Sequence, residues 1–163
     1  LQRVINVALN TMVTRKVDLT THLEEDLPPV CGDGEQLEQV YLNIINNAVA
    51  AMDGGGILNI AAKRVGDVIK VSFSDTGRGI SQEHMDRIFE PFFTTKKVGE
   101  GTGLGLSVSY AIVKKFGGDI VVESHTKEDR ETPGTTFTIV LPIAQKTECD
   151  PAATKEVGGK RNV

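Results

Sequence analysis

The strongest constraint on the fold of this chain is helical hydrophobic periodicity between residues 33 and 52. Apolar residues recur there at intervals of three or four, which places them on one face of a helix and requires that face to be buried. Asp33 is a suitable N-cap with Gln36 as its capping-box partner, and glycines at 54–56 follow the expected helix end. The apolar positions are Leu37, Val40, Tyr41, Ile44, Ile45, Ala48, Val49 and Met52.

Strand patterns provide a second layer to cover this helix. Further helices are expected at 1–14 and 104–116, with a short one after Ser81, and Gly66-Asp67 predicts a hairpin turn. Paired strands beside long amphipathic helices predict an α/β fold, a two-layer sandwich whose mixed, mostly antiparallel sheet is covered on one face by about three helices. The predicted strands are 16–23, 57–65, 68–75, 119–124 and 135–141.

Charge and hydropathy limit the class of function. The 163 residues include 18 Lys and Arg against 22 Asp and Glu, a net charge of −4. An acidic balance argues against general binding to nucleic acid or to anionic membranes. No apolar run approaches the ~20 residues needed to span a bilayer, so no direct membrane insertion by this segment is expected.

Cysteine use and the ends of the chain indicate its setting. Cys31 and Cys149 are the only cysteines, and their wide separation without metal-like spacing argues against a disulfide scaffold, a zinc site and a CxxC redox centre and favours a reducing compartment. We therefore expect a cytoplasmic location for this domain, even if the full-length protein is anchored in a membrane. Residues 1–143 are expected to form one domain and 144–163 a polar, flexible tail. Because the sequence does not begin with Met, we expect a fragment of a longer protein.

Three asparagines interrupt the long helix, although Asn is a poor residue for a helix interior. At ~100° per residue, Asn43 and Asn47 lie on the shoulder of the buried face and Asn46 points toward solvent. Two interpretations remain open. The amides could bridge to a neighbouring loop, or an amide oxygen could face a cavity and bind a hard cation.

Asp75 ends the strand 68–75 in register with Ile69, Val71 and Phe73, so its carboxylate should point toward the core. A buried carboxylate needs a hydrogen-bond donor. That donor is either a backbone or loop group of the protein, or a ligand group such as an exocyclic amine. The glycines of DTGRGI (75–80) favour the ligand, because they remove side chains where a flat ring would approach.

Glycine occupies every second position from 99 to 105 in GEGTGLGL, which opens into the helix LSVSYAIVKKF. Backbone N–H groups at a helix start attract phosphate, although such a stretch can also be a flexible linker. The P-loop, the dinucleotide-binding GxGxxG and the motifs of eukaryotic-type protein kinases are absent. His22, His84 and His125 lie in unrelated segments and are expected to be surface residues.

Together these segments resemble the ATP-binding catalytic domain of bacterial sensor histidine kinases, within the gyrase–Hsp90–histidine kinase–MutL ATPase superfamily. The order and spacing of five motifs match over about residues 1–143, and FEPFFTTK before GTGLGL points to histidine kinases rather than gyrase or Hsp90. The resemblance implies a Bergerat-type ATP-binding fold. The motifs are NIINNA (43–48, N box), DTGRGI (75–80, G1 box), FEPFFTTK (89–96, F box), GEGTGLGL (99–106, G2 box) and GTTFTIVLP (134–142, final glycine-threonine strand).

The resemblance implies roles for the matching residues. Asn47 would bind Mg²⁺, Asp75 would accept a hydrogen bond from the adenine amine, and Thr135 would support a water beside adenine. Asn43 stands where superfamily hydrolases carry a water-activating Glu. Because an amide is a poor base, this position fits phosphotransfer to a protein better than ATP hydrolysis. The residues expected to contact nucleotide are Asn47, Asp75, Gly77, Gly79, Ile80, Phe92, Lys96, Gly101, Thr102, Gly103, Leu104, Gly105, Leu106 and Thr135.

Lys96 is the expected basic contact to the phosphates, because Ala50 stands where some relatives of this kind carry Lys or Arg. Its alternatives are Lys97 and, less favoured, Arg78 or Arg87. The expected catalytic set is therefore Asn43, Asn47 and Lys96. Residues 92–102 are expected to form a lid that orders on ATP binding, anchored by Phe89 and Phe92.

The implied reaction is transfer of the γ-phosphoryl group of Mg²⁺-ATP to a histidine on a separate dimerisation domain of the same protein. A response regulator would act downstream, and the full-length protein is expected to be a homodimer. No HExxxP-type phospho-acceptor segment occurs in this sequence. The alternatives are an ATPase or protein-serine kinase of the same superfamily, a non-catalytic nucleotide-sensing or docking module, and an unrelated α/β scaffold.

Overall fold

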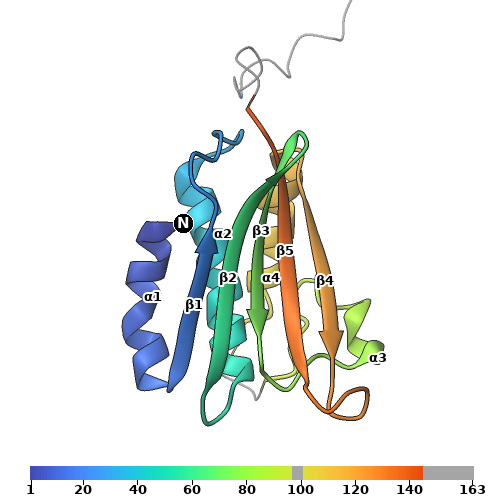
Figure 1. Cartoon of the computed structure of the whole chain (residues 1–163). Coiled ribbons are helices and arrows are strands. Elements are labelled where there is room, and N and C mark those ends of the chain that lie inside the picture. The colour runs from blue at the N-terminus through green and yellow to red at the C-terminus, as the bar shows by residue number, and fades with distance from the viewer. Residues whose placement is uncertain (97–100, 145–163) are drawn as a thin grey trace, which may run out of the picture.

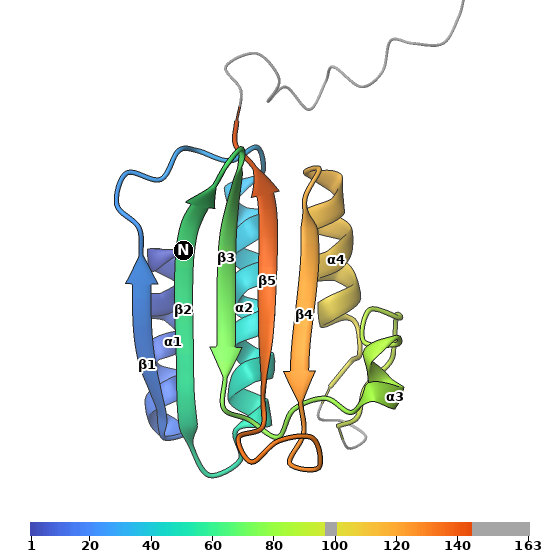
Figure 2. The same cartoon turned by 45° about the vertical axis from the view of Figure 1, so that its right-hand side comes forward.

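A computed structural model describes residues 1–96 and 101–144 of the chain, and the strands in that part form one mixed sheet. The strand order is β1-β2-β3-β5-β4, with β1 parallel to β2 and the other neighbours antiparallel. The three long helices lie on one face of this sheet (Figures 1 and 2), which confirms the predicted sandwich. The elements are α1 (Gln2–Thr14), β1 (Val17–Leu23), α2 (Gly34–Ala51), β2 (Gly56–Val65), β3 (Val68–Asp75), α3 (Gln82–Met85), α4 (Gly105–Lys115), β4 (Asp119–His125) and β5 (Gly134–Pro142).

Helix α2 lies at the centre of the core. Its apolar stripe is buried, and the helix contacts α1, α4 and β3. The Oδ1 atom of Asp33 accepts a hydrogen bond of 2.9 Å from the backbone N–H of Gln36, so the predicted N-cap is confirmed. The side-chain oxygen of Gln36 accepts from Nζ of Lys115 on α4 at 3.3 Å, so this residue also links the two helices.

The β2–β3 hairpin and strand β5 place two polar residues at one end of the sheet. The hairpin turns at Gly66-Asp67 as predicted, with Gly66 at φ +60°. Along β3 every second residue is buried, including Asp75 at the strand end, which confirms the predicted inward carboxylate. Strand β5 pairs Thr135 directly with Asp75, and both are buried.

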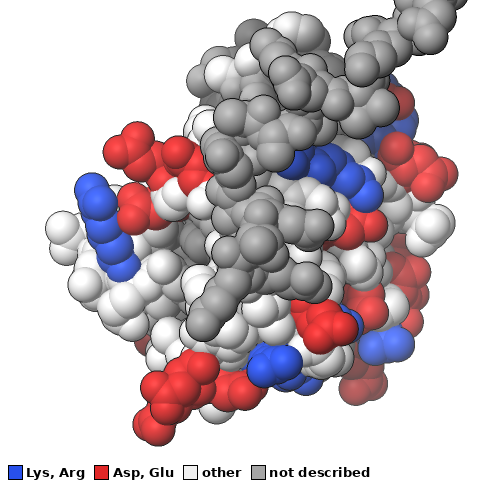
Figure 3. All heavy atoms as spheres, turned by 90° about the horizontal axis from the view of Figure 1, so that it is seen from above, with Lys and Arg blue, Asp and Glu red and all other residues white. Residues whose placement is uncertain are grey.

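No helix in the described part of the chain is long and apolar enough to cross a membrane. On the end of the molecule seen in Figure 3, acidic and basic side chains are interspersed among the visible, described atoms. Two expectations fall outside the described residues. These are the tail from residue 145 onward and the part of the expected lid at 97–100, which includes Lys97 and the first glycine of GEGTGLGL.

Candidate functional site

A cavity of about 620 Å³ opens where α2 and β3 end and α4 begins. Its walls come from α2, the 75–81 loop, the α3 region, residues 93–96 and the start of α4. The volume lies within the range of small-molecule binding sites. The sequence-predicted residues that line it are Asn43, Asn47, Asp75, Gly79, Ile80, Lys96, Gly101, Thr102, Gly103, Gly105, Leu106 and Thr135.

Asp75 places a carboxylate at the inner end of the cavity, with only 7% of its surface exposed. Its Oδ1 accepts two backbone N–H groups, from Gly77 at 2.8 Å and from Thr135 at 3.3 Å. Within the described residues, Oδ2 of Asp75 accepts no hydrogen bond. Every fully enclosed side-chain oxygen in that part of the chain has a hydrogen-bond partner, so Oδ2 cannot be fully enclosed and is open to the cavity that Asp75 lines. Burial raises the pKa of Asp75 from 3.8 to about 6, although the two N–H groups act in the opposite direction. One oxygen therefore has protein donors, and the other is available to a ligand.

Gly77 and Gly79, the two glycines after Asp75, lie where contacts with other parts of the protein leave no room for a side chain, which the sequence did not predict. Gly77 does not line the cavity, and a Cβ there would lie 2.8 Å from Oδ1 of Asp75 and from Cβ of Ala51. Gly79 has φ +76°, and its Cβ would meet the carbonyl oxygen of His125. Both glycines are therefore required by close packing of the protein against itself. The expectation that Gly77 lies beside a ligand ring is not supported.

Of the two interpretations of the asparagines on α2, Asn43 fits the amide that bridges to a neighbouring segment, and Asn47 fits the amide oxygen that faces a cavity and binds a cation. Nδ2 of Asn43 donates to the carbonyl of Gly105 and to Oγ of Ser109, both at 3.2 Å, so this amide bridges α2 to α4. Oδ1 of Asn47 accepts from Nζ of Lys96 at 3.3 Å, so this oxygen already attracts a cation. Asn46 is exposed as predicted, yet it also borders the cavity.

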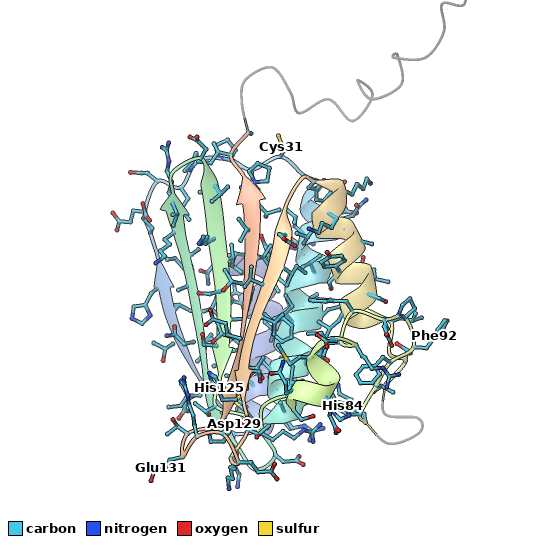
Figure 4. The ribbon with its side chains drawn as sticks, turned by 90° about the vertical axis from the view of Figure 1, so that its right-hand side faces the viewer. Cys31, His84, Phe92, His125, Asp129 and Glu131 are labelled. Atoms are coloured by element: carbon cyan, nitrogen blue, oxygen red, sulfur yellow. The ribbon has the colours of Figure 1, made fainter. Side chains whose placement is uncertain are left out.

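Phe92 is not brought to the cavity. It is 74% exposed with φ +67°, and Figure 4 shows its ring pointing away from the body of the protein. Its N–H donates to the carbonyl of Gly103 at 3.0 Å, and a Cβ at Gly103 would contact the backbone of Phe92. The two residues thus join the ends of the 92–103 segment. Leu104, the N-cap position of α4, also does not line the cavity.

Phe93 takes the place expected for Phe92, and His84 lines the cavity beside it. The two rings are 5.6 Å apart, and the guanidinium of Arg87 lies 4.5 Å from the Phe93 ring. Nδ1 of His84 is 2.9 Å from Oγ of Ser81, three residues earlier; the Ser81 helix start was the only sequence signal for this contact. Figure 4 shows His84 on α3.

Arg78, a weaker alternative to Lys96, also lines the cavity. The lining residues that the sequence analysis did not assign are Asn46, Ala48, Ala51, Ser81, His84, Ile88, Phe93, Thr94, Thr95, Thr126 and Phe137.

Comparison with protein families gives a match over residues 32–145 to the model of the histidine kinase-, DNA gyrase B-, and HSP90-like ATPases. Sporulation kinase E of Bacillus subtilis (strain 168) is 40% identical over 133 residues, which cover 81% of this chain and 17% of that protein. Sensor histidine kinase ZraS of Escherichia coli (strain K12) is 40% identical over 130 residues, covering 80% of this chain and 26% of that protein. The chain therefore spans only a minor part of the length of these curated relatives.

Solved structures agree with this match. The catalytic domain of histidine kinase ThkA has a TM-score of 0.75 and 27% identity, over 87% of this chain and 90% of that chain. The mycobacterial sensor histidine kinase MprB has a TM-score of 0.72 and 27% identity, over 87% of this chain and 95% of that chain. The fold of the described residues is thus that of these two histidine kinase structures.

Proposed function

The chain belongs to the family of histidine kinase-, DNA gyrase B- and HSP90-like ATPases, and from this we propose that it is the ATP-binding catalytic domain of a sensor histidine kinase. It would bind Mg²⁺-ATP and give the γ-phosphoryl group to a histidine on a dimerisation domain of the same protein. The observation that carries the proposal is that Asp75 and Asn47, from different elements, line one cavity. The domain would comprise residues 1–143.

The inner end of the cavity suits a purine base. Oδ2 of Asp75 is an acceptor without a protein donor within the described residues, and the amino group of adenine is a matching donor. Side chains of Ile80, Ile88 and Leu106 line the same cavity and would give a flat ring an apolar surface. A charged acceptor in a buried site makes a strong hydrogen bond, which supports Asp75 as the residue that holds adenine.

The outer end suits a triphosphate. The start of α4, an eleven-residue helix, opens onto the cavity through Gly105 and Leu106, and a helix N-terminus attracts anions. Lys96 adds a positive charge beside Asn47. Because the amide oxygen of Asn47 already accepts from an ammonium group, it fits a hard cation that prefers oxygen ligands. When bound, Mg²⁺ would neutralise charge on the phosphates, and Asn47 would supply one ligand oxygen.

The contacts of Asn43 favour phosphotransfer over hydrolysis. Its amide nitrogen donates to two acceptors on α4, and an amide is in any case a poor base for activating water. An imidazole acceptor is its own nucleophile, so the domain has only to position ATP and stabilise charge. The proposal also includes a homodimeric full-length protein, this domain in the cytoplasm, and a response regulator as the next phosphate acceptor.

The decisive experiment mixes this chain with a histidine-bearing dimerisation domain and γ-labelled ATP, and then tests the acid stability of the labelled protein. Acid-labile label on the partner is expected, and the Asp75→Asn variant should transfer less because it holds adenine weakly. Acid-stable label on serine or release of phosphate to water would instead support the serine kinase or ATPase alternatives. Absence of ATP binding by the wild-type chain would refute the proposal.

A further inference from the structure

Ser124 on β4 lies beside the inner end of the cavity and uses its full hydrogen-bonding capacity. Its Oγ is 2.8 Å from the backbone N of Ile80, 3.1 Å from the carbonyl oxygen of Gly134 and 2.8 Å from Oγ1 of Thr135. A serine hydroxyl has one hydrogen to donate and two lone pairs that accept. Three partners at these distances therefore require one donated and two accepted hydrogen bonds.

The chemistry of the partners decides which bond is which. The carbonyl of Gly134 can only accept, so it receives the hydrogen of Ser124. The N–H of Ile80 can only donate, so it occupies one lone pair. The second lone pair must then accept from the hydroxyl of Thr135. The single hydrogen of Thr135 is thus directed at Ser124, and Oγ1 of Thr135 has only lone pairs to offer to the cavity.

With its hydrogen directed at Ser124, Oγ1 of Thr135 is a hydrogen-bond acceptor toward the cavity, beside the acceptor Oδ2 of Asp75. Thr135 and Asp75 are paired across β5 and β3, both are buried, and both line the cavity. Oδ2 of Asp75 and Oγ1 of Thr135 together match a group with two hydrogens, such as a purine 6-amino group. A bridging water would carry the same preference, because both of its hydrogens would point to these acceptors and its oxygen would accept from the amine. A 6-oxo group would meet acceptors only.

We infer that Ser124 is a specificity-determining positioning residue, which makes the pocket prefer 6-amino over 6-oxo purines by fixing the direction of the Thr135 hydroxyl. The inference rests on the proposed function, since it concerns how the same cavity selects its nucleotide. Ser124 does not line the cavity itself and would act only through Thr135.

The test measures the affinities of ATP and inosine triphosphate, its 6-oxo counterpart, by calorimetry. In Ser124→Ala the Thr135 hydroxyl is free to turn and donate to a 6-oxo group. The ratio of the two affinities should therefore fall about tenfold, the order of one hydrogen bond. Ser124→Thr retains a hydroxyl and should restore the ratio. Ser74→Ala is the matched control, because it removes the Thr136–Ser74 hydroxyl pair of 2.9 Å between β3 and β5 and should leave the ratio unchanged.

The possible results separate this inference from the proposed function. A wild-type chain that binds neither nucleotide overturns both. A wild-type chain that prefers ATP, with the same preference in Ser124→Ala, overturns only the role of Ser124. Equal weakening of both nucleotides would indicate a purely structural residue and also overturns it. If Ser124→Ala does not fold, Ser124→Cys serves instead, because a thiol is a weak hydrogen-bonding group of similar size and should lower the ratio too.

Discussion

Replacing Asp75 by Asn tests two effects of its buried charge, because the free energy of unfolding at neutral pH should rise while the affinity for ATP should fall. Asp75 is 7% exposed, and burial raises the pKa of its carboxyl from 3.8 to about 6. The folded protein therefore holds the proton of Asp75 more tightly than the unfolded chain. The contribution of this group to stability is present below about pH 4 and is lost as the pH rises through about 6.

The size of the effect follows from the two pKa values. The difference between 3.8 and about 6 corresponds to about 3 kcal/mol of unfolding free energy at neutral pH. Asn has no charge and keeps an oxygen for the N–H groups of Gly77 and Thr135. We therefore expect the stability of Asp75→Asn relative to wild type to rise by about 2–3 kcal/mol from about pH 4 to pH 7.5. ATP affinity should meanwhile fall by more than about 1 kcal/mol, because in the proposed site adenine would lose its charged acceptor.

The assay is urea denaturation of both proteins across this pH range, followed by circular dichroism because the chain has no Trp. Asp129→Asn is the control, since the N–H and then the hydroxyl of Thr126 lower the pKa of Asp129. Because a lowered pKa places the titration of Asp129 below about pH 4, the stability of Asp129→Asn relative to wild type should stay nearly constant across this pH range and should not rise with pH. A stability difference for Asp75→Asn that is constant with pH, or that falls as the pH rises, would refute the reasoning.

Other substitutions test further contacts at the site. Lys96→Ala should slow phosphotransfer more than it weakens adenosine binding, because its ammonium lies at the proposed phosphate end; labelled transfer and calorimetry measure the two effects. Asn43→Ala should lower the free energy of unfolding by about 1 kcal/mol, as urea denaturation would show, since the carbonyl of Gly105 and the hydroxyl of Ser109 each lose one donor but stay bonded to each other. Gly79→Ala should cost more than about 1 kcal/mol in the same assay, because its φ is +76° and the new Cβ meets the carbonyl of His125.

Each of these predictions has a result that contradicts it. An unchanged rate of phosphotransfer in Lys96→Ala would show that Lys96 has no role in the reaction. Wild-type stability in Asn43→Ala would mean that the bridge between α2 and α4 is energetically neutral. For Gly79 the comparison is Gly54→Ala, where φ is +91° but no atom lies within 4 Å of the new Cβ. Equal losses at the two positions would show that the contact with His125 adds nothing to the backbone strain.

The sequence predicted those features that local burial decides. The period of α2 follows from which residues face the core, and the alternation along β3 follows from its two faces. Because Asp75 continues that alternation, its inward direction could be predicted without any knowledge of its partners. The hairpin at Gly66 was predictable for a similar reason, since a tight turn needs a residue that tolerates positive φ.

The remaining features depend on segments that are distant in the sequence. The donor bonds of Asn43 reach α4, 62 and 66 residues further along the chain, so no local pattern could reveal them. The close approach of Gly79 to His125 is of the same kind. At Phe92 an unusual left-handed backbone, held by Gly103, turns the ring outward and leaves Phe93 at the cavity. A non-glycine residue with positive φ is uncommon, so the sequence favoured the wrong phenylalanine.

The walls of the cavity differ in how freely they can be redesigned. Helix α2 supplies Asn47 and also fully buried core residues such as Ile44 and Ile45, so randomising it would yield many clones that do not fold. A second wall, formed by α3 and residues 93–96, includes His84 and Thr95, which line the cavity without belonging to that core. A library aimed at accepting altered nucleotides or inhibitors should therefore vary this second wall and keep the helix constant.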